Sequence, residues 1–153
     1  MKSMRRKDRE ITKEEAIQLL KTCDYGVLST STNDALPYGI PLSYCFINDA
    51  IYFHSALEGK KLDNFDENNS VSFCVVGETE VLQQKFSTKY ESVIIEGIIE
   101  EVFDKEKQLG LEGLIKKYSP DFVDEGLKYI DRAKDTTAVF KIEIKSLTGK
   151  ARR

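Results

Sequence analysis

Residues 53–65 read FHSALEGKKLDNF, and this stretch gathers side chains that can bind a phosphate group. It holds the chain's only histidine, His54, followed by Ser55, Gly59, Lys60 and Lys61. Where a strand gives way to a helix, the first backbone N–H groups of the helix are free and favour an anion. The glycine lets the backbone approach that anion closely, and the lysines and the hydroxyl add donors. The alternative is a solvated loop with an ordinary lysine pair.

Other chemistries find less support in the residue types. His54 and Ser55 are adjacent on an expected strand, so their side chains point to opposite faces and do not form a nucleophile–base pair. The three cysteines, Cys23, Cys45 and Cys74, are widely spaced, and with one histidine they do not make a zinc set. We expect buried thiols in a reducing compartment and no metal site. Neither a Gly-x-Gly-x-x-Gly nor a Gly-x-x-x-x-Gly-Lys-Ser/Thr pattern is present.

A second candidate stretch is PYGIPLSY, residues 37–44. Pro41 has no backbone N–H and interrupts the hydrogen bonding of a strand, so the stretch leaves main-chain groups free. Free main-chain N–H and C=O groups can line the edge of a planar heteroaromatic ring. We expect this stretch to be a sheet neighbour of the strand that carries His54, one hairpin away. The alternative for Pro41 is a plain edge strand.

The elements that would position these residues follow from periodicity and turn signals. Thr12 and Glu15 form a capping box that opens a helix at about 12–24. Asn48-Asp49 between two β-rich runs predicts a hairpin, and Gly97 predicts a bulge or a close approach. Further helices are expected at 59–67, 104–118 and 123–134, with strands between them and a final strand at 136–147. Several short strands joined by tight turns predict a barrel or sandwich covered by helices.

Composition limits the function classes. The chain has 153 residues and a formal net charge of -3, which argues against a general nucleic-acid binder. No apolar run of about 18 residues is present, and no apolar core follows the basic start, so we expect a cytoplasmic protein without a membrane span. One domain is expected over residues 1–153, with 1–10 as a flexible tail.

Taken as an ordered series, the sequence resembles a known family. The run ALPYGIPLSYCFINDAIYFHSALEGKKLDNFDENNSVSFCVV, followed by YESVIIEGIIEEV, is similar to the FMN-binding split barrels. Within them it resembles the nitroimidazole-reductase (Nim-type) branch of the pyridoxamine 5'-phosphate oxidase-like proteins. The likeness covers most of the chain, from the first helix to the closing strand. It implies a mainly β fold, a six-stranded antiparallel Greek-key split barrel with flanking helices.

The resemblance also implies a site and an activity. The protein would be a homodimer with FMN at the subunit interface, acting on a small-molecule substrate without nucleic acid or membrane. The implied cofactor-binding residues are Tyr38, Gly39, Ile40, Pro41, Leu42, Ser43, His54, Ser55, Gly59, Lys60, Lys61, Glu91 and Ser92. Electrons would pass from a reduced nicotinamide or another donor through FMN to a small acceptor such as a nitroaromatic. His54 is the candidate catalytic residue, as a proton donor.

Departures from the oxidases keep alternatives open. Lys60-Lys61 stands where pyridoxamine phosphate oxidases have an Arg-Lys clamp, and the chain lacks a second histidine for the vitamin B6 substrate. FAD, a deazaflavin or haem are alternative cofactors. The alternative functions are a non-catalytic flavin- or haem-binding module, a redox sensor on the same fold, or a small ligand-binding barrel without redox chemistry.

Overall fold

The computed structural model describes residues 3–153. Its α-helices are α1 Lys13–Thr22, α2 Lys60–Glu67, α3 Asp104–Tyr118 and α4 Val123–Ala133, with short 3-10 helices at Lys7–Arg9, Gln83–Lys85, Pro120–Phe122 and Lys134–Thr136. Its strands are β1 Gly26–Ser31, β2 Pro37–Leu42, β3 Cys45–Ile47, β4 Ala50–Ser55, β5 Ser70–Val76, β6 Glu80–Leu82, β7 Ser87–Val102 and β8 Ala138–Arg152. All four predicted helices therefore form.

The strands make one antiparallel sheet in the order β2-β1-β5-β7-β8-β4-β3, and β6 pairs with β7 beside this path. Among the described residues, six strands have at least six residues, and β3 and β6 have three each. The mainly β split barrel with flanking helices predicted from the sequence is confirmed. Six strands were expected, and the structure has two short strands, β3 and β6, in addition to six longer ones.

The first and last strands of the sheet path are consecutive in the chain. β2 and β3 are joined by Ser43 and Tyr44 alone, and the chain changes its partner at this point. Before it, Leu42 pairs with Gly26 of β1, and after it, Cys45 pairs with Tyr52 of β4. The sheet therefore returns to its starting point, as a split barrel requires.

This change of partner corrects one expectation. Residues 37–42 were expected beside the strand that carries His54, but β2 pairs with β1, and only β3 pairs with β4. Pro41 pairs in register with Val27 of β1. β2 lies at the end of the sheet path, where the missing N–H of a proline costs no central ladder bond.

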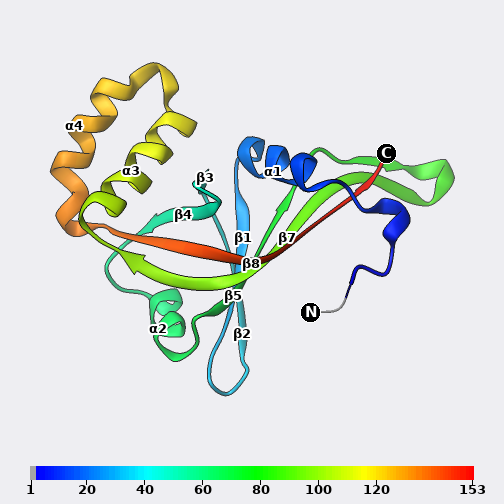
Figure 1. Cartoon of the computed structure of the whole chain (residues 1–153), viewed down its shortest axis with the longest axis horizontal. Coiled ribbons are helices and arrows are strands. Elements are labelled where there is room, and N and C mark those ends of the chain that lie inside the picture. Colours follow the sequence, from blue (N-terminus) through cyan, green and yellow to red (C-terminus); the bar gives the residue numbers. More distant parts are fainter. Residues whose placement is uncertain (1–2) are drawn as a thin grey trace.

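Figure 1 shows β7 and β8 as long strands that cross the molecule. α1 lies on one side of them and α2 on the other, while α3 and α4 form a helical hairpin at one end. The opposite end holds the β6–β7 hairpin and the C-terminus. Among residues 3–153, no helix has the length and apolar character needed to cross a bilayer.

Two local predictions are confirmed in detail. The capping box of α1 forms, with the Glu15 N–H donating to Thr12 Oγ1 at 3.1 Å and the Thr12 N–H donating to Glu15 Oε1 at 3.4 Å. Gly97 lies at a register shift between β7 and β8, where a Cβ would stand 2.3 Å from the Glu143 carbonyl oxygen. The bulge and the close approach therefore coincide, and no larger residue fits there.

The expected tail at 1–10 lies partly outside the described residues. Within them, Glu10 forms an isolated bridge with Lys150, and the Ile11 N–H donates to the Gly149 carbonyl at 3.1 Å. Residues 10 and 11 are thus attached to β8. The three cysteines are free thiols, with Cys45 buried and the other two half-buried.

Candidate functional site

The position of α2 is set first by aromatic packing. Phe65, buried on the inner face of α2, meets Phe140 of β8 with ring centroids 5.0 Å apart in an edge-to-face arrangement. Phe53 of β4 stacks on Phe140 at 5.6 Å and also contacts Phe65 at 6.3 Å. Such aromatic pairs add roughly 0.5–1.5 kcal/mol each beyond the area that they bury. The cluster anchors the helix beneath β4 and β8.

A buried polar relay then ties α2 to β1 and β2. Asn64 Nδ2 donates to Thr30 Oγ1 at 3.1 Å, and Thr30 Oγ1 donates to the Tyr38 carbonyl at 3.3 Å. Both Asn64 and Thr30 are 4% exposed, so water does not replace either partner. A second bond, from Asn68 Nδ2 to Ser31 Oγ at 2.9 Å, holds the end of the helix to the same strand.

Sequence reasoning missed Thr30, Asn64 and Asn68 as positioning residues. A signal was available at position 64, because an amide directly before Phe65 falls on the apolar face of a short helix. A polar side chain at such a position requires a hydrogen-bond partner. The identity of that partner, 34 residues earlier in the chain, depends on the fold.

The N-terminus of α2 is open to an anion. Gly59 is its N-cap residue, with φ of 152° and no side-chain cap, and a Cβ there would meet nothing within 4 Å. The N–H groups of Leu62 and Asp63 bond to the Gly59 carbonyl, whereas those of Lys60 and Lys61 have no acceptor within the described part of the chain. Free helical N–H groups of this kind bind phosphate and carboxylate groups.

Most charges of α2 run against its own dipole. Lys60 and Lys61 occupy its first turn together with one acid, Asp63, while Asp66 and Glu67 occupy its last turn, which has no basic residue. Cations at the N-terminus and anions at the C-terminus each cost an exposed helix about 0.3–1 kcal/mol. Helices whose charges oppose the dipole in this way are typical of functional sites. The position of the paired lysines is therefore not explained by the stability of the helix.

The two candidate stretches, residues 37–44 and 53–65, do contact each other, but through the packing of α2 rather than through sheet pairing. The Lys60 ammonium lies over the Tyr38 ring, 4.7 Å from its centroid. The relay through Thr30 holds the backbone of the same tyrosine. α2 therefore brings its lysines to the start of β2 although β2 and β4 do not pair.

The rest of the candidate stretch in β2 is an edge strand. Gly39 and Pro41 are exposed, while Ile40 and Leu42 are half-buried and pack against the main core. Ser43, just after the strand, is exposed. One edge of β2 pairs with β1, and the other edge has no strand partner among the described residues. Main-chain groups along that edge are thus available to a planar ring.

His54 and Ser55 face opposite sides of β4. The His54 side chain is exposed, whereas Ser55 is 7% exposed and its hydroxyl donates to the Ala56 carbonyl at 3.0 Å. Partial desolvation of the imidazole lowers the pKa of His54, and the nearby Lys61 charge lowers it further. Both effects favour the neutral imidazole. A neutral imidazole has one acceptor nitrogen, which can take up a proton. Only the imidazolium formed in this way can act as a proton donor near neutral pH.

Glu91 and Ser92 lie elsewhere in the protomer. Both are on β7, where they pair with Ala151 and Lys150 of β8. The Glu91 carboxylate accepts hydrogen bonds from Arg153 at 3.1 and 3.2 Å. The structure therefore does not bring these two residues to α2 within one chain.

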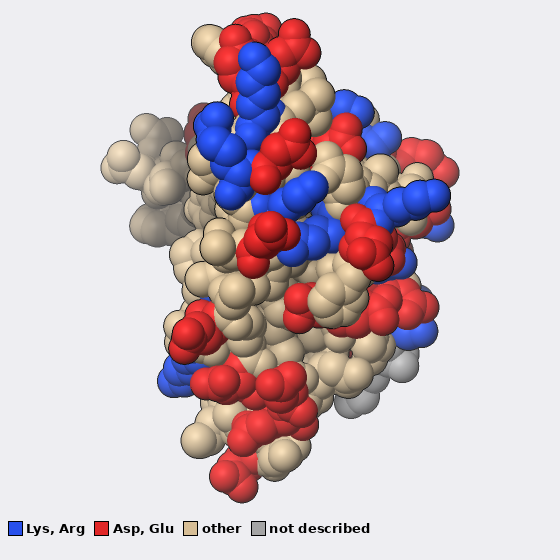
Figure 2. Space-filling view, turned by 90° about the vertical axis from the view of Figure 1, so that its left-hand side faces the viewer, with Lys and Arg blue, Asp and Glu red and all other residues tan. Residues whose placement is uncertain are grey.

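The surroundings of α2 are acidic. Figure 2 shows red side chains gathered in the lower part of the face that it displays, at the level of α2 in Figure 1. A cavity of about 490 Å³ beside α2 has five carboxylate residues in its lining: Glu58, Asp63, Asp66, Glu100 and Glu101. Lys60 and Lys61 thus stand out as the positive end of an otherwise negative region.

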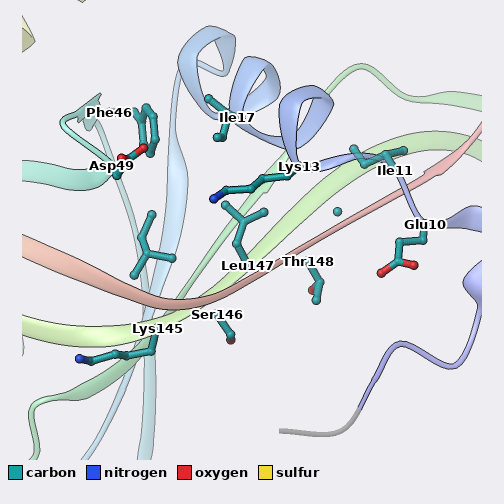
Figure 3. Close-up of a pocket in the computed structure, with 12 residues that line it drawn as sticks. Glu10, Ile11, Lys13, Ile17, Phe46, Asp49, Lys145, Ser146, Leu147 and Thr148 are labelled. Carbon is teal, nitrogen blue, oxygen red and sulfur yellow. The ribbon is translucent and has the colours of Figure 1, made fainter.

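A second cavity of similar size lies away from these residues. Figure 3 shows a cavity of about 500 Å³ between α1, the β3–β4 turn and β8, with Lys13 directed into it over Leu147. None of the sequence-predicted site residues lines this cavity. Within the described residues, no group of three or more His, Cys, Asp or Glu side chains is arranged to hold a metal ion.

Comparisons with solved structures reproduce the fold. A candidate 5-nitroimidazole antibiotic resistance protein from Bacteroides thetaiotaomicron is 23% identical, with a TM-score of 0.76 over 93% of this chain and 86% of that one. A conserved hypothetical protein from Mycobacterium tuberculosis is 18% identical, with a TM-score of 0.84 over 99% and 91%. An FAD and haem binding protein from Mycobacterium smegmatis is 18% identical, with a TM-score of 0.79 over 95% and 74%. These likenesses establish the split-barrel architecture.

A search of the curated proteins found no match. The family comparison is decisive, because the model described as pyridoxamine 5'-phosphate oxidase matches residues 12–151. That range includes every candidate residue of β2, β4, α2 and β7. The chain belongs to the pyridoxamine 5'-phosphate oxidase family.

Proposed function

We propose that this protein is an FMN-dependent oxidoreductase of the nitroimidazole-reductase-like type. The observation that carries the proposal is the uncapped N-terminus of α2, where Lys60 and Lys61 sit against the helix dipole and beside Tyr38. Family membership and the FAD, haem and nitroimidazole-related proteins of the same fold support it. The proposed acceptor is a small nitroaromatic, and the proposed donor is a reduced nicotinamide.

The residues present fit the phosphate group of FMN. Gly59 leaves open space in front of the helix, the N–H groups of Lys60 and Lys61 have no acceptor within residues 3–153, and both side chains carry an ammonium group. Each charge-assisted hydrogen bond to a phosphate contributes about 1.5–3 kcal/mol when it is shielded from water. The free edge of β2, from Tyr38 to Ser43, would hold the ring by main-chain groups.

When bound, FMN supplies two-electron redox chemistry. The protein's own part is to bind, orient and exclude water, and to move a proton at His54. Because the pKa of His54 is lowered, the neutral imidazole is favoured, and it accepts a proton before it delivers one. Ser55 faces the interior, so its role is to shape the turn into α2 by its bond to the Ala56 carbonyl.

We propose further that the cofactor lies between two copies of the chain. His54 pairs with Val139, and Val139 pairs with Val102 of β7, which is ten residues beyond Ser92. At about 3.3 Å per residue, His54 and Ser92 are roughly 30 Å apart along the sheet. If both contact one flavin, Glu91 and Ser92 must come from the second copy.

The outer face of the sheet offers apolar area for such a contact. Val27, Cys74 and Ile94 lie in one row across β1, β5 and β7, because Val27 pairs with Cys74 and Cys74 pairs with Ile94. Val27 is 37% exposed and Ile94 is 50% exposed in the single chain. Apolar side chains in a row on a sheet face are typical of a surface that a partner covers.

Absorbance and mass analysis of the co-purifying cofactor test the assignment. We expect flavin bands and the mass of FMN, and we expect bleaching by NADH or NADPH that is reversed by a nitroaromatic. A Soret band would instead select the haem-binding alternative, with His54 as the single available histidine ligand. Bound flavin that no nicotinamide reduces would select the non-catalytic module.

A paired-lysine variant tests the phosphate site itself. Replacing Lys60 and Lys61 together with Ala should weaken FMN binding by more than about tenfold, since each decade corresponds to about 1.4 kcal/mol. The matched control replaces Lys105 and Lys128, two exposed lysines of the α3–α4 hairpin, and should leave the flavin titration unchanged. Equal affinity in the two double variants would remove the basis of the proposal.

A further inference from the structure

A cavity between α1, β3 and α3 combines an apolar floor with a positively charged wall. Its volume is about 550 Å³, and Figure 1 shows α1 and α3 on either side of β3. Cavities of this size accommodate small organic molecules. Its lining residues are Lys21, Cys45, Phe46, Ile47, Leu109, Glu112, Gly113, Lys116 and Lys117. None of them belongs to the proposed flavin site.

The floor of the cavity is closed by a tight approach of α3 to β3. At Gly113, a Cβ would lie 2.3 Å from Ile47 Cδ1 and 2.9 Å from Cys45 Sγ. Cys45 is buried, and Phe46 and Ile47 are half-buried, so the strand presents apolar side chains to the cavity. Leu109 of α3 is 37% exposed and adds an apolar wall. The interior therefore favours a ligand with an apolar body.

The charge of the lining is positive. It includes three lysines, Lys21, Lys116 and Lys117, and one acid, Glu112. None of the ion pairs found within residues 3–153 involves any of these four residues. Three like charges around one hollow repel each other, and an anion placed among them relieves that repulsion.

Lys117 provides the second, independent observation. Its ammonium is the one buried side-chain polar atom without a hydrogen-bond partner in the part of the chain that the structure describes. It lies 3.7 Å from the centroid of the Tyr44 ring, and desolvation lowers its pKa. An aromatic face offsets only part of the cost of burying a charge and accepts no strong hydrogen bond. This donor therefore lacks an acceptor over the Tyr44 ring, and the cavity that Lys117 lines supplies one when the side chain turns away from that ring.

We propose that this cavity binds a small apolar carboxylate. Its hydrocarbon part lies against Phe46, Ile47 and Leu109, and its carboxylate is held by Lys116 and Lys117, with Lys21 adding charge from α1. Glu112 at the rim opposes the anion. The proposal is independent of the flavin assignment, because it uses other residues and a ligand without redox chemistry.

Octanoate is the probe, and octanamide is the matched neutral molecule. Titrated into the full-length protein by calorimetry, octanoate should bind with one site per chain. Octanamide should bind at least about tenfold more weakly, the loss expected for one charge-assisted hydrogen bond. Equal affinity for the acid and the amide, or no binding of octanoate, would overturn the proposal.

Variants then locate the site. Lys116→Met and Lys117→Met should each weaken octanoate binding by about tenfold. The control is Lys128→Met on α4, a lysine that does not line the cavity, and it should leave octanoate binding unchanged. Glu112→Gln should tighten binding several-fold, an effect that damage to the fold does not produce. Circular dichroism establishes that each variant is folded. If Glu112→Gln has no effect, or if Lys116→Met matches Lys128→Met, the site is not where we propose.

Discussion

Replacing Thr30 with Val is expected to loosen α2 and thereby the proposed phosphate site. The two side chains have the same shape, so the change removes a hydroxyl without leaving a cavity. In the structure that hydroxyl accepts from Asn64 Nδ2 at 3.1 Å and donates to the Tyr38 carbonyl at 3.3 Å. Without it, the amide of a residue that is 4% exposed has no acceptor and no access to water.

The size of the effect follows from that burial. Leaving one buried donor unsatisfied costs about 1–3 kcal/mol, so we expect the free energy of unfolding to fall by about 2 kcal/mol. For a domain of this size, each kcal/mol lowers the melting temperature by about 2–4 °C, which gives a decrease of roughly 4–8 °C. FMN affinity should fall in parallel, because the relay joins α2 to the backbone of Tyr38.

Urea unfolding followed by circular dichroism measures the change, and Asn64→Leu completes a double-mutant cycle. Since replacing both partners with apolar groups removes the unsatisfied amide, the double variant should be more stable than the sum of the single effects predicts, by on the order of 1 kcal/mol. The control is Thr22→Val on α1, where the exposed hydroxyl bonds only within its own helix. It should change stability by less than about 0.5 kcal/mol.

Two outcomes would refute the reasoning. One is a Thr30→Val protein as stable as the Thr22→Val control. The other is a cycle in which the effects at Thr30 and Asn64 simply add, which would mean that the two side chains are not coupled. Either result would assign the position of α2 to the packing of Phe65 and to the bond between Asn68 and Ser31.

Two further predictions address the single histidine and the bulge. The imidazole proton signal of His54, the only histidine, should titrate with a midpoint below the ordinary value of about 6.5, and Lys61→Gln should raise that midpoint because a neighbouring positive charge is removed. The unfolded chain takes up this proton more readily than the folded protein does. The contribution of His54 to the free energy of unfolding is therefore present above about pH 6.5 and is lost as the pH falls through the lower pKa of the folded state. A titration midpoint that Lys61→Gln leaves unchanged would contradict this account. Gly97→Ala should lower the free energy of unfolding in urea by more than about 1 kcal/mol, because the added Cβ would lie 2.3 Å from the Glu143 carbonyl oxygen. A variant as stable as the wild type would show that β7 and β8 separate there without cost.

The sequence by itself determined the elements and the local chemistry. The capping box of α1, the hairpin at Asn48-Asp49 and the bulge at Gly97 are short-range signals, and each is present in the structure. The ordered series of motifs was sufficient to identify the family, which the match over residues 12–151 confirms. The capping box and the hairpin depend on residues a few positions apart, whose preferences the backbone expresses almost regardless of context.

The tertiary structure alone decided which candidate residues meet. Tyr38 contacts Lys60 because β2 leaves β1 at Ser43 and Tyr44, and because Thr30 and Asn64 join across a distance of 34 residues. Ser92 stands apart from His54 because β8 lies between their strands, and His54 pairs near the start of β8 with Val139 whereas Ser92 pairs near its end with Lys150. Such contacts depend on how the sheet closes and on which buried donors find acceptors, and neither is expressed in any short stretch of the chain.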